Sequence, residues 1–345
     1  KKAVGCFPIY APEEIVYAAG ALPVGMWGGP TLGNLSDKYF QTFCCSIMKA
    51  NMEQALKGIY ENLSAVIIST FCDTLKCTIE NWKAAVSHLN IVPIVYPQNR
   101  KSDAGKAFLK EEFQRITGEL ENILNVTVND SDLEESFKIY EDYRATMRRF
   151  VKMSGNYPVL FDAVTRHQII KAAYFMDKKI FTAKLKKLLE HVSQIPVEKF
   201  DGKRIIITGL LAEPDEFLEL FSENNLVIVA DDLAQESRQF RAKAPKEGTA
   251  MERMIERVAL QDGCSFLYDF GKSRIDMLID LKNEYNADGI VFCQLKFCDP
   301  EEFDYPLIKK GLEARGIPML YLEIEQQMDS VEQLRTRIQT FSEIL

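Results

Sequence analysis

The sequence predicts an α/β protein made of two Rossmann- or flavodoxin-like domains with parallel sheets, with a helical segment between them. Three observations lead to this prediction. The 345 residues are enough for two or three domains of roughly 100 to 200 residues each. Short apolar runs alternate with helical periodicity at both ends of the chain, whereas the middle shows helical periodicity alone. We therefore expect an N-terminal α/β domain at 1–100, a helical segment at 101–200 and a C-terminal α/β domain at 201–345.

The first hundred residues alternate strand and helix signals. Short apolar runs predict strands at 4–7, 22–27, 65–70 and 91–96. Apolar residues at helical spacing predict helices at 12–19, 45–61 and 73–87. Such alternation is typical of a parallel sheet with helices on both faces.

The middle of the chain lacks strand signals. Apolar residues recur there at helical spacing among charges, as at Leu109, Phe113 and Ile116, and Asp130 and Ser131 could cap one helix. The strand signals return at 204–208, 227–230, 289–293 and 318–324, with helices expected at 213–224 and 331–345. The predicted order is therefore α/β, helical, α/β.

Composition and charge exclude several classes of partner. The chain has 42 Lys plus Arg against 50 Asp plus Glu, a net charge of -8, and no basic cluster of the kind that follows a phosphate backbone. We expect no nucleic-acid partner. The apolar runs are far shorter than the ~20 residues that span a bilayer, and the first residues do not resemble a signal peptide. We therefore expect a cytoplasmic protein with no membrane partner.

Eight cysteines raise the question of thiol or metal chemistry, because cytosolic thiols stay reduced. The three histidines, His88, His167 and His191, are widely separated in the sequence. A histidine-rich metal site is therefore not expected, and any metal would be held by sulfur.

The two α/β regions share a short pattern that ends in a cysteine. Residues 65–73 and 289–299 each form an apolar run that leads into Phe-Cys-Asp, which places Cys72 and Cys298 at helix starts. Cys44 and Cys45 open a third predicted helix. Three thiolates from separate segments can hold a [4Fe-4S] cluster and leave its fourth iron for a non-protein ligand. The alternative is that these cysteines are small buried side chains, since no CxxC pair is present.

Two long motifs resemble a known family. The opening GCFPIYAPEEIVYAAGALPV at 5–24 and the closing KFCDPEEFDYP at 296–306, together with 323–327 and 335–341, resemble the 2-hydroxyacyl-CoA dehydratases. The resemblance covers essentially the whole chain. Within the family the chain is most similar to the β subunits of heterodimeric enzymes that act on (R)-2-hydroxyisocaproyl-CoA and related thioesters.

The resemblance implies a ligand set for the cluster. The family's [4Fe-4S] ligands match Cys45, Cys72 and Cys298, with Cys44 as an alternative to Cys45. The remaining cysteines are expected to serve packing; they are Cys6, Cys77, Cys264 and Cys293.

The resemblance also implies a function. The family eliminates water from (R)-2-hydroxyacyl-CoA to give 2-enoyl-CoA, through a ketyl radical formed when one electron is added to the thioester carbonyl. The implied partners are a homologous α subunit that carries most of the substrate site and an ATP-dependent iron-sulfur activator protein. An ATP-binding Gly-x-x-x-x-Gly-Lys-Ser/Thr loop is missing from this sequence, so ATP use is expected on the activator. The implied role of this chain is to relay electrons.

Other interpretations stay open at this point. A benzoyl-CoA reductase-type subunit would share the fold and the electron source, and a non-enzymatic electron-transfer protein would share the cluster. Glu13 and Glu14 are candidate catalytic groups, or simply acids in the first turn of a helix. The segment 231–241 could line an interface or a cleft, or be a solvated loop. The sequence does not identify the acyl group.

Overall fold

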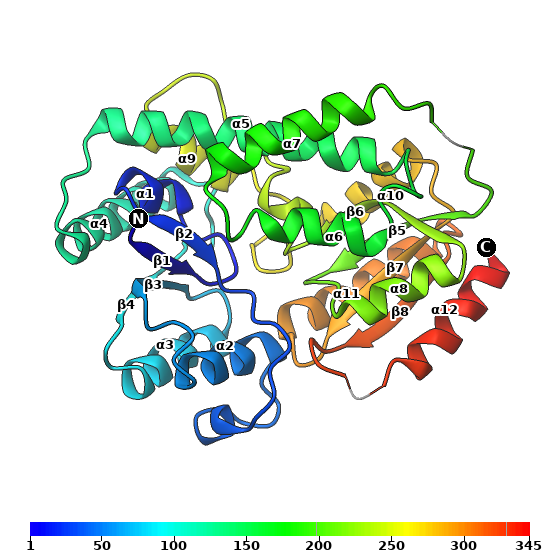
Figure 1. The fold of residues 1–345 in the computed structure, drawn as a ribbon, viewed down its shortest axis with the longest axis horizontal. Helices are drawn as coiled ribbons and strands as arrows, with labels where there is room; N and C mark the ends of the chain where they lie inside the picture. The colour runs from blue at the N-terminus through cyan, green and yellow to red at the C-terminus, as the bar shows by residue number, and fades with distance from the viewer. Residues whose placement is uncertain (198, 329) are drawn as a thin grey trace.

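The computed structural model describes residues 1–197, 199–328 and 330–345, and it shows two parallel sheets surrounded by helices (Figure 1). Each sheet has four strands within the described residues, and every strand pair is parallel. The predicted fold class is therefore confirmed. No helix among these residues is both long enough and apolar enough to cross a membrane.

The first sheet has the strand order β2-β1-β3-β4. Its strands are β1 (Ala3–Cys6), β2 (Leu22–Gly25), β3 (Leu63–Ser69) and β4 (Asn90–Ile94). Side chains alternate between its faces, as a strand requires. Ala65 and Ile67 pack toward α1 (Glu13–Ala18) and α4 (Asp103–Leu124). Val66 and Ile68 pack toward α2 (Ser46–Leu56) and α3 (Asp73–Ala85).

The second sheet has the equivalent order β6-β5-β7-β8. Its strands are β5 (Lys203–Gly209), β6 (Leu226–Leu233), β7 (Gly289–Leu295) and β8 (Met319–Ile324). One face packs against α10 (Arg274–Glu284) and α11 (Asp299–Glu313). The other packs against α8 (Asp215–Glu223) and α12 (Glu332–Ile344).

The middle of the chain supplies four helices, as its periodicity predicts. They are α4, α5 (Asp130–Ser154), α6 (Ala163–Ala172) and α7 (Lys178–Val192). The predicted cap at Asp130 and Ser131 is wrong by one residue: the N-cap of α5 is Asn129, whose side chain accepts a hydrogen bond from the Asp132 backbone. Gly155 follows the last residue of α5. Helices α5 and α7 pack against each other and run across one side of both sheets (Figure 1).

The structure contains two helices that the sequence analysis does not predict, α9 (Ala250–Ala259) and α10. The sequence does contain a helix-start signal for α9. Thr249 and Glu252 form a capping box, and buried apolar residues follow it. The helix expected at 45–61 ends at Leu56, shortly before Gly58, which adopts a positive φ of 79°.

A single hydrophobic core joins the two sheets. It contains Val66 and Ile68 from β3 together with Ile207 from β5 and Val291 from β7. The loops after β3 and β7 border the same pocket, so the carboxyl ends of these two strands meet there. Ligands of open parallel sheets collect at this edge.

Candidate metal centre

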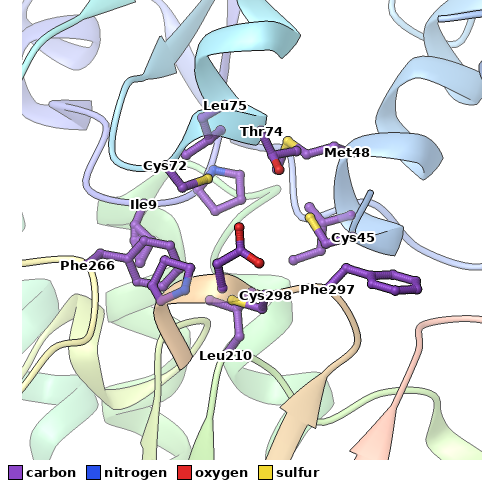
Figure 2. Close-up of a pocket in the computed structure, with 14 residues that line it drawn as sticks. Ile9, Cys45, Met48, Cys72, Thr74, Leu75, Leu210, Phe266, Phe297 and Cys298 are labelled. Carbon is purple, nitrogen blue, oxygen red and sulfur yellow. The ribbon is translucent and has the colours of Figure 1, made fainter. Parts of the chain in front are cut away.

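Three cysteines from separate helix starts line one pocket. Cys45 is the N-cap residue of α2, Cys72 of α3 and Cys298 of α11. Figure 2 shows the three side chains around one pocket. The prediction that these cysteines lie at three helix starts is confirmed, and the structure also brings them together.

The fold explains why they meet. Cys72 follows β3 and Cys298 follows β7, and each strand is central in its sheet. A strand that ends in a short loop before a helix delivers the N-cap residue to the carboxyl edge of the sheet. Cys45 reaches the same place from α2, which packs on α3.

The pocket is lined mainly by apolar side chains. Cys45 and Cys298 are 8% and 5% exposed, and Cys72 is half-buried. Their apolar neighbours include Ile9, Met48, Leu75, Leu210 and Phe266, while Thr74 and Asp299 add polar groups. This lining keeps most water away from the sulfur atoms.

The pKa values of the three thiols are shifted in different directions. The Cys44 thiol donates to Cys45 and thereby lowers the pKa of Cys45, against the effect of burial. Burial raises the pKa of Cys72 to about 12 and that of Cys298 well above its usual value. Charge on Cys45 raises the pKa of both other thiols, so the three sulfurs lie within electrostatic range of one another. A bound cationic group would be needed to hold all three as thiolates.

Backbone N–H groups of the following helices oppose the effect of burial. The N–H groups of Met48, Leu75 and Glu301 each lower the pKa of the cysteine three residues earlier. None of the three thiol side chains forms a full capping hydrogen bond. The helix N-termini therefore favour negative charge on the sulfurs while leaving them available as ligands.

Two bulky residues beside the pocket have left-handed backbone conformations. Tyr10, which follows Ile9, and Phe297, which precedes Cys298, both have φ of 61°. This region is unfavourable for side chains of their size and is associated with functional loops. Phe297 lines the pocket and is 41% exposed.

The donor set consists of three thiols, the ligand type that iron-sulfur clusters take. Within the described ranges, no group of three or more His, Cys, Asp or Glu side chains is arranged to hold one metal ion. The fit of a [4Fe-4S] cluster therefore rests on the ligand type and on the meeting of the three cysteines at one pocket.

The other cysteines lie elsewhere. Cys44 lines a neighbouring polar cleft, and its Sγ lies 3.7 Å from the Cys45 carbonyl oxygen. Cys45 rather than Cys44 therefore faces the pocket. Cys6, Cys264 and Cys293 are buried and Cys77 is exposed, and none of the four lines the pocket.

Glu13 and Glu14 lie at a different small cavity, between α1 and α5. The Glu14 carboxylate is 2.6 Å from Arg144 Nη1 and 3.2 Å from Arg257 Nη2. Burial raises the pKa of Glu14, but these arginines outweigh it and lower the pKa to about 2. Glu13 accepts a hydrogen bond from Tyr140 Oη at 3.0 Å. Neither acid lines the cysteine pocket.

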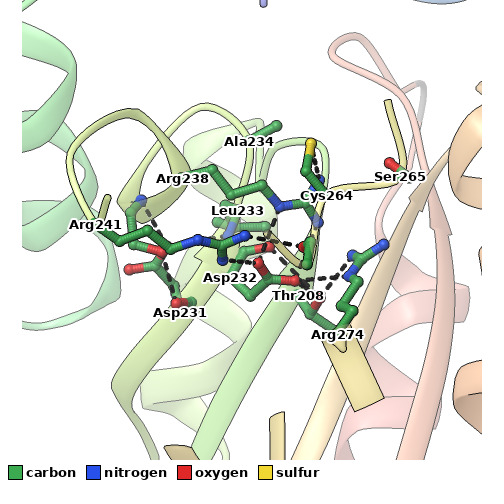
Figure 3. A network of polar contacts seen from close by, with 12 residues as sticks. Thr208, Asp231, Asp232, Leu233, Ala234, Arg238, Arg241, Cys264, Ser265 and Arg274 are labelled. Atoms are coloured by element: carbon green, nitrogen blue, oxygen red, sulfur yellow. Dashed lines mark hydrogen bonds and ion pairs between the residues drawn. The ribbon is translucent and has the colours of Figure 1, made fainter. Parts of the chain in front are cut away.

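The segment 231–241, for which the sequence left a cleft, an interface or a solvated loop open, is mostly buried. Its Asp232 pairs with Arg238 and Arg241 of the segment and with Arg274 (Figure 3). Asp231 and Glu236 pair with Arg166 instead. The sequence signal was an unusual density of opposite charges directly after a strand. The pairing partners could not be found from the sequence because Arg274 and Glu301 lie far along the chain.

Comparisons with known proteins agree with one another. A family model described as 2-hydroxyglutaryl-CoA dehydratase, D-component, matches residues 8–345. The (R)-phenyllactyl-CoA dehydratase beta subunit of Clostridium sporogenes is 43% identical over 345 residues, which cover 100% of this chain and 92% of the relative. The lactoyl-CoA dehydratase subunit beta of Anaerotignum propionicum is 43% identical with the same two coverages. The (R)-2-hydroxyglutaryl-CoA dehydratase subunit beta of Acidaminococcus fermentans is 34% identical, covering 100% of this chain and 93% of the relative.

Proposed function

Because the chain belongs to the 2-hydroxyglutaryl-CoA dehydratase D-component family and is a subunit of a 2-hydroxyacyl-CoA dehydratase, a hydro-lyase, we propose that it is the electron-relaying β subunit. In this proposal Cys45, Cys72 and Cys298 hold one [4Fe-4S] cluster. The observation that carries it is the meeting of three N-cap cysteines at one buried pocket.

When bound, the cluster supplies one low-potential electron, which the reaction needs to make the β proton of the substrate acidic enough to leave. The residues of this chain provide the conditions for holding it. The three cysteines offer thiolate ligands, and their helix N-termini stabilise the negative charge on sulfur. Ile9, Leu75 and Phe266 exclude water from the sulfurs. A low-dielectric lining of this kind tunes the potential of a bound cluster.

The beta-subunit names of the relatives support a relay role, because they imply a second, alpha subunit. We therefore place the substrate mainly on a homologous α subunit. An ATP-dependent iron-sulfur activator is the proposed source of the electron.

The test is anaerobic coexpression of this chain with the α subunit from the same genome, followed by iron analysis and assays for 2-enoyl-CoA. We expect about four irons in this chain. Ala in place of Cys45, Cys72 or Cys298 should deplete this iron and abolish dehydration. Cys44→Ala, and Cys77→Ala as an exposed control, should retain both.

Two results would overturn the proposal. Full iron retention in Cys298→Ala would remove the ligand assignment. Reduction of an aromatic acyl-CoA, with no turnover of any 2-hydroxyacyl-CoA, would replace dehydration with the chemistry of a benzoyl-CoA reductase-type enzyme.

A further inference from the structure

Glu301 lies directly behind the cysteine pocket. It is the third residue of α11, three positions after Cys298, and it is 0% exposed. Its backbone N–H donates to the Cys298 carbonyl oxygen at 3.1 Å. Any constraint on the Glu301 side chain therefore also constrains the turn that presents Cys298.

The Glu301 carboxylate is held by three side chains from other segments. Arg238 Nη1 lies 2.8 Å from Oε1, and Arg274 Nη2 lies 2.8 Å from Oε2. Ser265 donates its hydroxyl to Oε1 at 2.7 Å. The first turn of α11 is thus tied to the start of α10, to the short 3-10 helix Ser237–Gln239 and to the loop that contains Ser265.

The two arginines are fixed in turn by Asp232, at the end of β6 (Figure 3). Arg238 binds both oxygens of this carboxylate, with Nε 3.0 Å from Oδ1 and Nη2 3.1 Å from Oδ2. Arg274 Nε lies 2.8 Å from Oδ2, and Thr208 donates its hydroxyl to the same oxygen at 2.7 Å. Bidentate and charge-assisted contacts of this kind define a rigid geometry.

The fully buried part of this network is electrically balanced. Asp232 and Glu301 carry two negative charges against the two positive charges of Arg238 and Arg274. Arg241, which also pairs with Asp232, has a side chain that is 20% exposed and adds a further positive charge at the edge. Asp304, whose side chain is 14% exposed, adds a negative charge at the edge, 3.4 Å from Arg274 Nη1. Without Glu301, the fully buried part would keep one carboxylate for two arginines, and a low-dielectric interior transmits such an imbalance strongly.

We propose that Glu301 is a positioning residue that keeps the reduction potential of the group held at Cys298 low. Its carboxylate fixes the first turn of α11 and cancels the positive charge that Arg238 and Arg274 would otherwise exert on the pocket. A bound cluster gains negative charge when it accepts an electron, so uncompensated arginines favour reduction and raise the midpoint potential. The inference rests on the proposed cluster.

The test compares Glu301→Gln with Glu302→Gln in the complete heterodimer. Glu302 is the next residue of α11 and is exposed, so its variant removes the same charge outside the network. Loading iron-57 into this chain alone, before pairing with an unlabelled α subunit, lets Mössbauer spectra report its cluster during a dithionite titration. We expect a positive shift of the midpoint potential in Glu301→Gln and a much smaller one in Glu302→Gln.

Arg241→Gln gives a second, less disruptive variant, because this arginine lies at the edge of the network. It removes a positive charge and should shift the midpoint potential in the negative direction. Structural damage alone would not produce shifts of opposite sign. If Glu301→Gln does not hold iron, the inference is tested by Arg241→Gln alone. A negative shift of its midpoint potential supports the inference, and a positive shift overturns it.

Equal potentials in the wild type, Glu301→Gln and Arg241→Gln, or shifts of the same sign in both variants, would overturn the inference. Absence of iron from the wild-type chain would instead overturn the proposed function. The two failures are therefore distinguishable.

Discussion

The loops that follow β3 and β7 place a cysteine in the same way but support it differently. Each strand leads through Phe-Cys-Asp into a helix whose N-cap is the cysteine. Three residues later the first sheet has Leu75, which is 3% exposed, and the second has Glu301, which is 0% exposed. The backbone arrangement is repeated, whereas the charge behind the sulfur is present on one side only.

The side chains packed behind the two cysteines also differ. Behind Cys72, Phe71 stacks on Tyr96 with ring centroids 4.5 Å apart. Behind Cys298, Arg238 and Arg274 pair with Glu301. Strand and helix geometry alone is therefore enough to deliver the ligand, and the ion network serves another purpose. This is why we assign it to the electrostatics of the site.

Placing an acid behind Cys72, as Glu301 lies behind Cys298, should give the largest effect. Leu75→Glu would bury a carboxylate among apolar side chains that offer no arginine, so we expect a loss of at least roughly 5 kcal/mol in the free energy of unfolding and loss of bound iron. Leu75→Met, which conserves volume, should cost less than about 1.5 kcal/mol. Urea unfolding and iron analysis measure both. A stable, iron-loaded Leu75→Glu protein would show that the two supports are interchangeable.

Removing the centre of the ion network should be slightly less damaging. Asp232→Asn keeps the shape of the side chain but leaves buried Arg238 and Arg274 with Glu301 as their one fully buried carboxylate, which should cost roughly 3 to 5 kcal/mol in urea unfolding. Asp276→Asn on α10 removes an exposed carboxylate, 74% accessible, and should change stability by less than about 0.5 kcal/mol. Equal effects of the two variants would contradict the structural importance of the network.

A second ion cluster behind the second sheet should make stability depend on pH. His167 Nδ1 lies 2.9 Å from Glu236 Oε1, and Nε2 lies 3.3 Å from Glu213 Oε1. Burial lowers the pKa of His167, but these carboxylates outweigh it and raise the pKa to about 9. The folded protein therefore binds the proton more tightly than the unfolded chain, whose histidine titrates near ~6.5.

This stabilisation is fully present below pH ~6.5 and is lost as the pH rises through about 9. We expect the free energy of unfolding to fall by roughly 2 to 3 kcal/mol across that range. His167→Gln should flatten the slope. The corresponding cluster near the first sheet, in which Glu14 pairs with Arg144 and Arg257, contains no histidine and should not contribute to it. An unchanged slope in His167→Gln would rule out this assignment.

The smallest expected effect concerns the substrate. If this chain only relays electrons, 2-hydroxyacyl-CoA should leave the Mössbauer spectrum of an iron-57 cluster in this chain unchanged. A second cluster, which we expect to bind the substrate in the proposed α subunit, should respond. The matched control carries the label in the α subunit instead. A substrate-dependent change at one iron site of this chain would move the substrate site here.

Part of this site could be predicted from the sequence, because its signals are local. The Phe-Cys-Asp repeat places Cys72 and Cys298 at helix starts, and strand periodicity identifies both sheets. The partners of Asp232 and Glu301 could not be predicted, since ion pairs between distant segments leave no periodic pattern. The same holds for the pairing of Glu14 with Arg144, which requires α1 and α5 to be packed first. The family resemblance already favours Cys45 over Cys44, and in the structure Cys45 is the one that lines the pocket.

The distribution of the three cysteines along the chain constrains when the proposed cluster can be inserted. Cys45 and Cys72 belong to the first sheet, and Cys298 follows the third strand of the second. Ribosomal synthesis delivers the first two thiols long before the third, and chains of this kind begin to fold from the N-terminus while they are still being made. The complete ligand set of the proposed cluster therefore arises only after β7 has been made, when the chain already contains the first sheet and most of the second.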